Sequence, residues 1–102
     1  MSDFIEKAVP EKESFAEREI LIENQYGIHA RPAAMLVKTA SMFNAEITIT
    51  KGSINVSGKS IMGLMTLEAC YGSMIRVTAS GPDAMQALDE IQKLFEQKFN
   101  EE

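Results

Sequence analysis

The segment AEITITKGSINVSGK, residues 45–59, constrains the fold of this chain more than any other part of its sequence. Its first run alternates, so that Ile47 and Ile49 share one face of an extended strand. Its second run places Ile54 and Val56 on one face in the same way. Two alternating, β-branched runs around a Lys-Gly turn predict an antiparallel β-hairpin.

The remaining periodic segments predict two further strands and three helices. The strands are expected at residues 19–23 and 74–80, and the helices at residues 30–41, after Ser60 and from Pro82 onward. Proline fits a first helical turn, because the N–H that it lacks has no intrahelical partner there. The order β-α-β-β-α-β-α predicts an α+β fold: an open-faced sandwich, with a four-stranded antiparallel sheet covered on one face by three helices.

The helical segments carry apolar stripes that predict the core. The first long helix has its stripe at 3.6-residue spacing, and the last helix has another, which we expect to extend to Phe99. Cys70 is predicted to be a small buried hydrophobe. The stripe residues are Ala33, Leu36, Val37 and Ala40 in the first case, and Ala84, Ala87, Leu88, Ile91, Leu94 or Phe95, and Phe99 in the second.

Length and charge narrow the function classes. The 102 residues suit one domain with one core, and the net charge of −5 without a basic patch argues against nucleic acid as a partner. A single cysteine excludes an internal disulfide and a multi-cysteine metal site. No apolar run reaches the roughly 18 residues of a membrane span. The acidic N-terminus is unlike a secretory signal, so we expect a cytoplasmic protein without metal or cofactor.

The two ends of the chain are expected to lie outside the core. Residues 1–18 are interpreted as an N-terminal extension, and residues 19–102 as the folded domain. The extension has apolar residues at helical spacing before Pro10, which is compatible with a short docked helix or with a flexible tail. The acidic end at residues 100–102 is expected to be a solvated tail.

His29 is the only histidine of the chain, and it precedes the first long helix. The first N–H groups of a helix lack intrahelical partners, and the helix dipole adds partial positive charge there. A phosphoryl group on the imidazole would therefore face free N–H groups, and the guanidinium of Arg31 could pair with its oxygens. A surface histidine beside an unrelated arginine fits the same local pattern.

Two sequence motifs favour the phosphoryl-carrying interpretation of His29, because they resemble segments of a known family. The segment GIHARPAAMLVKTA resembles the active-site segment of HPr, the histidine-containing phosphocarrier of the phosphoenolpyruvate-dependent sugar phosphotransferase system. The segment GKSIMGLMTL resembles the regulatory region of HPr from Gram-positive-type systems. The resemblance runs from Glu19 to Phe99. The family pattern Gly-[Ile/Leu]-His-x-Arg-Pro-Ala is supplied by Gly27, Ile28, His29, Arg31, Pro32 and Ala33.

The resemblance implies a phosphoryl carrier rather than an enzyme. His29 would accept the phosphoryl group from phosphorylated enzyme I on Nδ1 and pass it to a sugar-specific enzyme IIA domain. Ser60 would be modified by an ATP-dependent HPr kinase/phosphorylase, partly to control a transcription regulator of the CcpA type. The partners would dock on Ile61, Met62, Leu64 and Met65, of which Leu64 or Met65 could instead belong to the core alone. The carrier would be a monomer.

Three points stay open in the sequence. Tyr26 stands where many relatives have a small polar residue, and it could contact the phosphate or only pack over the loop. Ser60 could serve only as a helix cap, which is a common role for serine. As alternatives to sugar uptake, the chain could be a regulatory HPr-like protein, or a small α+β ligand-binding or interaction domain without phosphate chemistry.

Overall fold

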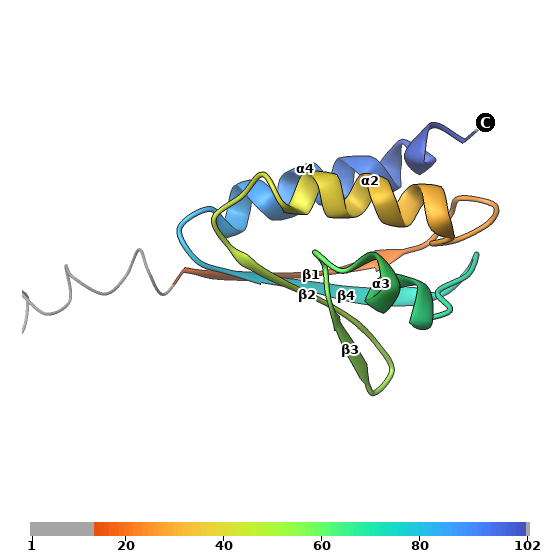
Figure 1. Ribbon diagram of the computed structural model, residues 1–102, viewed down its shortest axis with the longest axis horizontal. Helices are drawn as coiled ribbons and strands as arrows, with labels where there is room; N and C mark the ends of the chain where they lie inside the picture. The colour runs from red at the N-terminus through yellow and green to blue at the C-terminus, as the bar shows by residue number, and fades with distance from the viewer. Residues whose placement is uncertain (1–13, 102) are drawn as a thin grey trace, which may run out of the picture.

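The computed structural model describes residues 14–101 and has the order of elements that the sequence predicts (Figure 1). Four strands form one antiparallel sheet in the order β1-β4-β2-β3. The strands are β1 (Phe15–Leu21), β2 (Glu46–Lys51), β3 (Ile54–Ser57) and β4 (Met74–Ser80). The helices are α2 (Ala30–Ala40), α3 (Ile61–Thr66) and α4 (Ala84–Glu96), followed by the short 3-10 helix η1 (Lys98–Asn100).

Helices α2 and α4 lie over one face of the sheet, and α3 packs against α2 and β3 (Figure 1). This arrangement confirms the predicted open-faced α+β sandwich. Within residues 14–101, no helix is long and apolar enough to cross a membrane.

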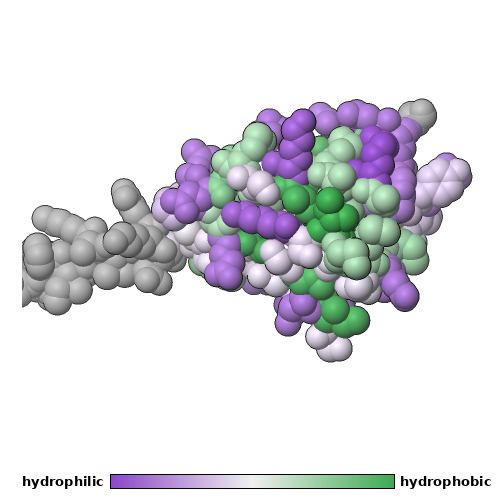
Figure 2. All heavy atoms as spheres, in the orientation of Figure 1, coloured by the Kyte–Doolittle hydropathy of each residue, from purple (hydrophilic) through white to green (hydrophobic). Residues whose placement is uncertain are grey.

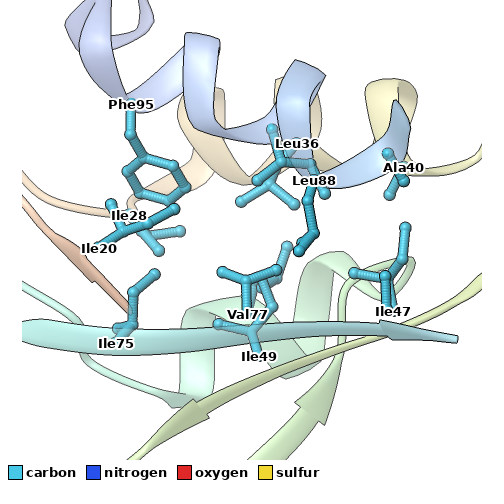
Figure 3. Packing of buried hydrophobic residues seen from close by; sticks show 14 of the residues in the cluster. Ile20, Ile28, Leu36, Ala40, Ile47, Ile49, Ile75, Val77, Leu88 and Phe95 are labelled. Carbon is cyan, nitrogen blue, oxygen red and sulfur yellow. The ribbon is translucent and has the colours of Figure 1, made fainter. Parts of the chain in front are cut away.

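The core fills the layer between the helices and the sheet. Leu36 of α2 and Leu88 of α4 point toward Ile49 and Val77, which project from the sheet (Figure 3). These four side chains are at most 1% exposed, so the alternating strands and the helical stripes bury one another as expected. Of the two candidates at the end of the α4 stripe, Phe95 is buried and Leu94 only half-buried.

The first strand begins at Phe15 rather than at Glu19. It pairs with β4 along its whole length, from Phe15 opposite Ser80 to Leu21 opposite Met74. Residues 15–18 therefore belong to the sheet and not to an N-terminal extension. Glu17 and Glu19 face outward, while Arg18 lies on the helix side and pairs with Asp89 of α4 at 2.8 Å, so a charged residue at an inward position hides the strand in the sequence. The helix considered before Pro10 lies outside the described residues.

Three local predictions are wrong for reasons visible in the structure. Pro82 precedes helix α4 instead of opening it, because Asp83 is the N-cap and its carboxylate accepts the N–H of Asn44 at 2.8 Å. Cys70 is exposed, because the inward position of that segment is taken by Ala69. Phe99 is buried as predicted, but it lies in η1 and not in a continued α4.

Candidate functional site

His29 is the N-cap residue of helix α2. Its backbone is extended, and its carbonyl accepts the first helical hydrogen bond, from the N–H of Ala33 at 2.9 Å. Its side chain makes no capping hydrogen bond and is 41% exposed. The imidazole is therefore at the positive end of an eleven-residue helix without being used to hold that helix together.

The loop before His29 is held by backbone contacts with the segment that follows α3. The N–H of Ile28 donates to the carbonyl of Ala69 at 2.9 Å, and the side-chain amide of buried Asn24 donates to the carbonyl of Gly27 at 2.7 Å. Gly27 has a φ of +66°, and a Cβ at this position would lie 2.4 Å from the Ala69 oxygen. Only glycine fits where the loop passes this close to the backbone of Ala69, which explains why the loop has glycine two residues before the histidine.

The imidazole ring contacts two side chains. Its Nε2 lies 2.8 Å from Oε2 of Glu101, and its face-to-edge neighbour is Tyr26, with ring centroids 6.0 Å apart at 86°. Tyr26 is itself 67% exposed, so it flanks the imidazole at the surface. The hydrogen bond between the ring and Glu101 thus uses Nε2 and not Nδ1.

Glu101 is a site residue that the sequence analysis missed, since the acidic end was expected to be a solvated tail. Its side chain is only 14% exposed, and its second carboxylate oxygen is buried. The hydrogen bond from His29 lowers the pKa of Glu101 below its ordinary value of 4.5, against the opposing effect of burial. No local pattern signals this contact, because His29 and Glu101 are 72 residues apart.

Arg31 lies in the first turn of α2 and is exposed. Its guanidinium donates to the carbonyl of Phe99 at 2.7 Å and points a second nitrogen at the sulfur of Met35, 3.1 Å away. His29 and Arg31 therefore both contact the segment after α4. A carboxylate and a carbonyl oxygen now accept from the two side chains that the sequence predicts to hold a phosphoryl group.

Ser60 is the N-cap of α3, and its capping role is directly visible. Its Oγ accepts the N–H of Gly63 at 3.0 Å, and its side chain is half-buried. A Cβ on Gly63 would lie 3.2 Å from both that hydroxyl oxygen and Cβ of Val56. The small residue in the first turn of α3 thus lets the cap and strand β3 approach the helix closely.

Helix α3 presents an apolar patch to solvent, which we define as Ile61, Met62 and Met65. These side chains are 41%, 75% and 44% exposed. Of the two alternatives for Leu64, docking surface or core, the structure shows the core: the side chain is fully buried and cannot touch a partner. Figure 2 shows apolar side chains gathered on this face of the molecule, over the region of α2 and α3, with hydrophilic side chains around them.

The site of His29 is separate from the groove along α4. Within residues 14–101, no group of three or more His, Cys, Asp or Glu side chains is placed to hold a metal ion. An open groove of about 820 Å³ runs along α4, and it is lined by residues such as Arg18, Phe43 and Asp89 rather than by His29. The chemistry that the histidine offers is therefore that of an exposed surface group.

Known proteins are similar to this chain in both sequence and fold. Residues 16–97 match the family described as "PTS HPr component phosphorylation site". The phosphocarrier protein HPr of Treponema pallidum is 43% identical over 81% of this chain and 94% of that protein. The phosphocarrier protein NPr of Shewanella violacea is 45% identical over 83% of this chain and 93% of that protein.

Solved structures agree with these relatives. The crystal structure of HPr-C-His from Thermoanaerobacter tengcongensis has a TM-score of 0.82 and 42% identity, and the match covers 85% of this chain and 98% of that one. HPr from Bacillus anthracis has a TM-score of 0.77 and 38% identity over 80% of this chain and 98% of that one. The chain therefore belongs to the HPr family of phosphocarrier proteins of the phosphotransferase system.

Proposed function

We propose that this protein carries a phosphoryl group on Nδ1 of His29, accepting it from phosphorylated enzyme I and passing it to sugar-specific enzyme IIA domains. One observation carries the proposal: a part-exposed imidazole stands at the N-cap of α2 and makes no capping bond. An imidazole in that position is reachable by a donor and by an acceptor, and it has backbone N–H groups beside it for an anion.

The neighbourhood of the imidazole suits a carrier better than a hydrolase. Arg31 is exposed and can exchange the Phe99 carbonyl for phosphate oxygens, to which guanidinium binds more strongly. The phosphoryl group would stay at the surface, where a second protein can remove it. We place the protein in the cytoplasm as a monomer, in keeping with exchange between separate proteins.

The partners would dock on the apolar patch of α3. Flexible methionine side chains adapt to partners of different shape, and two of the three patch residues are methionines. Helix α3 packs against α2, so a protein bound to the patch would also reach the start of α2. Enzyme I, enzyme IIA domains and the kinase would use overlapping parts of this surface.

We further propose that Ser60 is phosphorylated by an ATP-dependent HPr kinase/phosphorylase. Ser60 is adjacent to Ile61 of the patch, so about two added negative charges would border the surface on which partners dock. The modification would weaken apolar docking and would create a site for a regulator of the CcpA type.

The test of the carrier function is intact mass after incubation with enzyme I and phosphoenolpyruvate. We expect one phosphoryl group that is labile in acid and stable in alkali, and we expect none on the His29→Ala variant. Absence of the group on the unmodified protein, with a cognate enzyme I that phosphorylates a control carrier, would contradict the proposal.

A second candidate is a regulatory HPr-like protein that acts through its phosphorylation state without serving sugar uptake. The observation that favours it is the position of the Ser60 hydroxyl beside the patch. Phosphoryl transfer from His29 to any enzyme IIA domain of the same cell would contradict this candidate. Transfer from enzyme I with no enzyme IIA acceptor, together with a regulator that binds only after Ser60 is modified, would support it.

A further inference from the structure

The chain after helix α4 makes a tight turn that ends against His29. Its residues Lys98, Phe99 and Asn100 have φ values of 53°, 53° and 57°. Consecutive left-handed residues other than glycine are rare, so surrounding contacts must hold them there. Phe99 provides one such contact: its side chain is fully buried, and its ring meets Phe95 edge to face with centroids 4.9 Å apart.

Two hydrogen bonds then fix the direction in which Glu101 points. The Phe99 carbonyl accepts from Arg31 at 2.7 Å, and the N–H of Glu101 donates to the carbonyl of Lys98 at 3.0 Å. As a result, the Glu101 carboxylate lies 2.8 Å from Nε2 of His29 and is 14% exposed. The contact is thus made by an anchored turn and not by a tail that samples the solvent.

We propose that Glu101 is a positioning residue for phosphoryl transfer, because its carboxylate accepts the Nε2–H of His29 and thereby leaves the lone pair of Nδ1 to attack phosphorus. This inference rests on the proposed carrier function. An ionised carboxylate can only accept, so the nitrogen that faces it must carry the proton. The hydrogen bond of one ring nitrogen in turn decides the state of the other.

The transfer step balances without a proton leaving the ring. The Nδ1 lone pair forms the new N–P bond, and the bond between phosphorus and the donor breaks, with its electron pair returning to the donor. The imidazole then bears positive charge while Nε2 keeps its proton. The Glu101 carboxylate stabilises that charge at 2.8 Å, and the reverse step restores the neutral ring when the acceptor takes the phosphoryl group.

The kinetic test compares Glu101→Gln and Glu101→Ala with a matched control, Glu46→Gln, which removes an exposed carboxylate from strand β2. We expect Glu101→Ala to transfer about 10-fold more slowly from phosphorylated enzyme I, since hydrogen bonds to charged groups have effects of this order. KM for phosphorylated enzyme I should not change, because Glu101 is largely buried. Glu101→Gln keeps an acceptor atom, so its transfer rate should lie between those of Glu101→Ala and the unmodified protein. The transfer rate of the control Glu46→Gln should equal that of the unmodified protein.

The spectroscopic test asks which ring nitrogen carries the proton. Long-range proton–nitrogen correlation spectra of the neutral protein should show His29 as the Nε2–H form alone, and Glu101→Ala should show a mixture with the Nδ1–H form. Equal transfer rates and the same tautomer in all variants would overturn the inference while leaving the carrier function intact. A protein that accepts no phosphoryl group but keeps a Glu101-dependent tautomer would overturn only the carrier function.

Discussion

Gly27 determines whether the loop of His29 can close onto its neighbours. Gly27→Ala should lower the free energy of unfolding by about 3 kcal/mol or more, because the new methyl adds a backbone clash to the strain of a positive φ. Gly52→Ala is the matched control: its φ is +62°, and nothing lies within 4 Å of the added Cβ. It should lower that free energy by only about 1 kcal/mol.

Urea unfolding of both variants measures this difference, since the midpoint shifts with stability while the slope stays constant. Equal losses for the two substitutions would show that conformational strain dominates and that the loop yields to the clash. In that case the contact between Gly27 and Ala69 would not be tight in solution.

At the same residue scale, the contact between His29 and Glu101 predicts how stability depends on pH. The folded-state pKa of Glu101 is lowered, chiefly by the hydrogen bond from His29, so the unfolded chain binds its proton first as the pH falls. The stabilisation is fully present above the ordinary value of 4.5 and disappears as the pH falls through the lower, folded value.

Unfolding of the unmodified protein and of Glu101→Gln at a series of pH values tests this sign. The difference in their free energies of unfolding should be greatest above the ordinary pKa of Glu101 and should vanish in strong acid. The His29→Ala background removes the partner of the carboxylate and should remove most of the pH dependence. A difference in the free energy of unfolding that grows toward acidic pH would contradict a lowered pKa of Glu101 in the folded protein.

At the scale of an element, helix α3 separates a core role from a surface role within a few residues. Leu64→Ala should lower the free energy of unfolding by about 2–5 kcal/mol, because it leaves a cavity in the core. Met62→Asp should leave stability within about 0.5 kcal/mol of the original, since the Met62 side chain is 75% exposed. It should instead raise KM for phosphorylated enzyme I.

Chemical unfolding together with transfer kinetics distinguishes the two effects. If Met62→Asp leaves KM unchanged, the Met62 side chain does not belong to the docking surface. This conclusion does not depend on the result for Leu64→Ala.

The cap of α3 allows a further prediction at this scale. Ser60→Ala should lower the free energy of unfolding by about 1 kcal/mol, because the N–H of Gly63 loses its acceptor. Ser53→Ala, in the exposed turn between β2 and β3, is the control and should change little. Thermal unfolding measures both variants, and equal melting temperatures would show that water replaces the Ser60 hydroxyl as acceptor.

At the scale of the whole molecule, the sequence predicts what depends on local periodicity. The alternation of Ile47 and Ile49 and the stripe through Leu36 are properties of neighbouring residues, so the hairpin, helix α2 and their shared core could be foreseen. The position of His29 at a helix start could be foreseen for the same reason, since Pro32 marks the first turn.

Contacts between distant parts of the chain could not be foreseen in this way. The start of β1 at Phe15 depends on pairing with the far end of β4. The choice between core and surface for Leu64, which the sequence leaves open, depends on how α3 lies against the core. Glu101 reaches His29 through a turn of left-handed residues that follows α4. Nothing in the composition of the last residues indicates that turn.

The hydrogen bond from Ile28 to Ala69 has a consequence for how unrelated proteins can share one carrier. It joins the loop of His29 to the chain that leaves α3, so a backbone contact ties the loop to the segment that carries the apolar patch. If partners dock on the patch as proposed, each would meet the start of α2 at the same offset from its contact with α3. Donors and acceptors would then need no common shape, only a reactive group set at that offset.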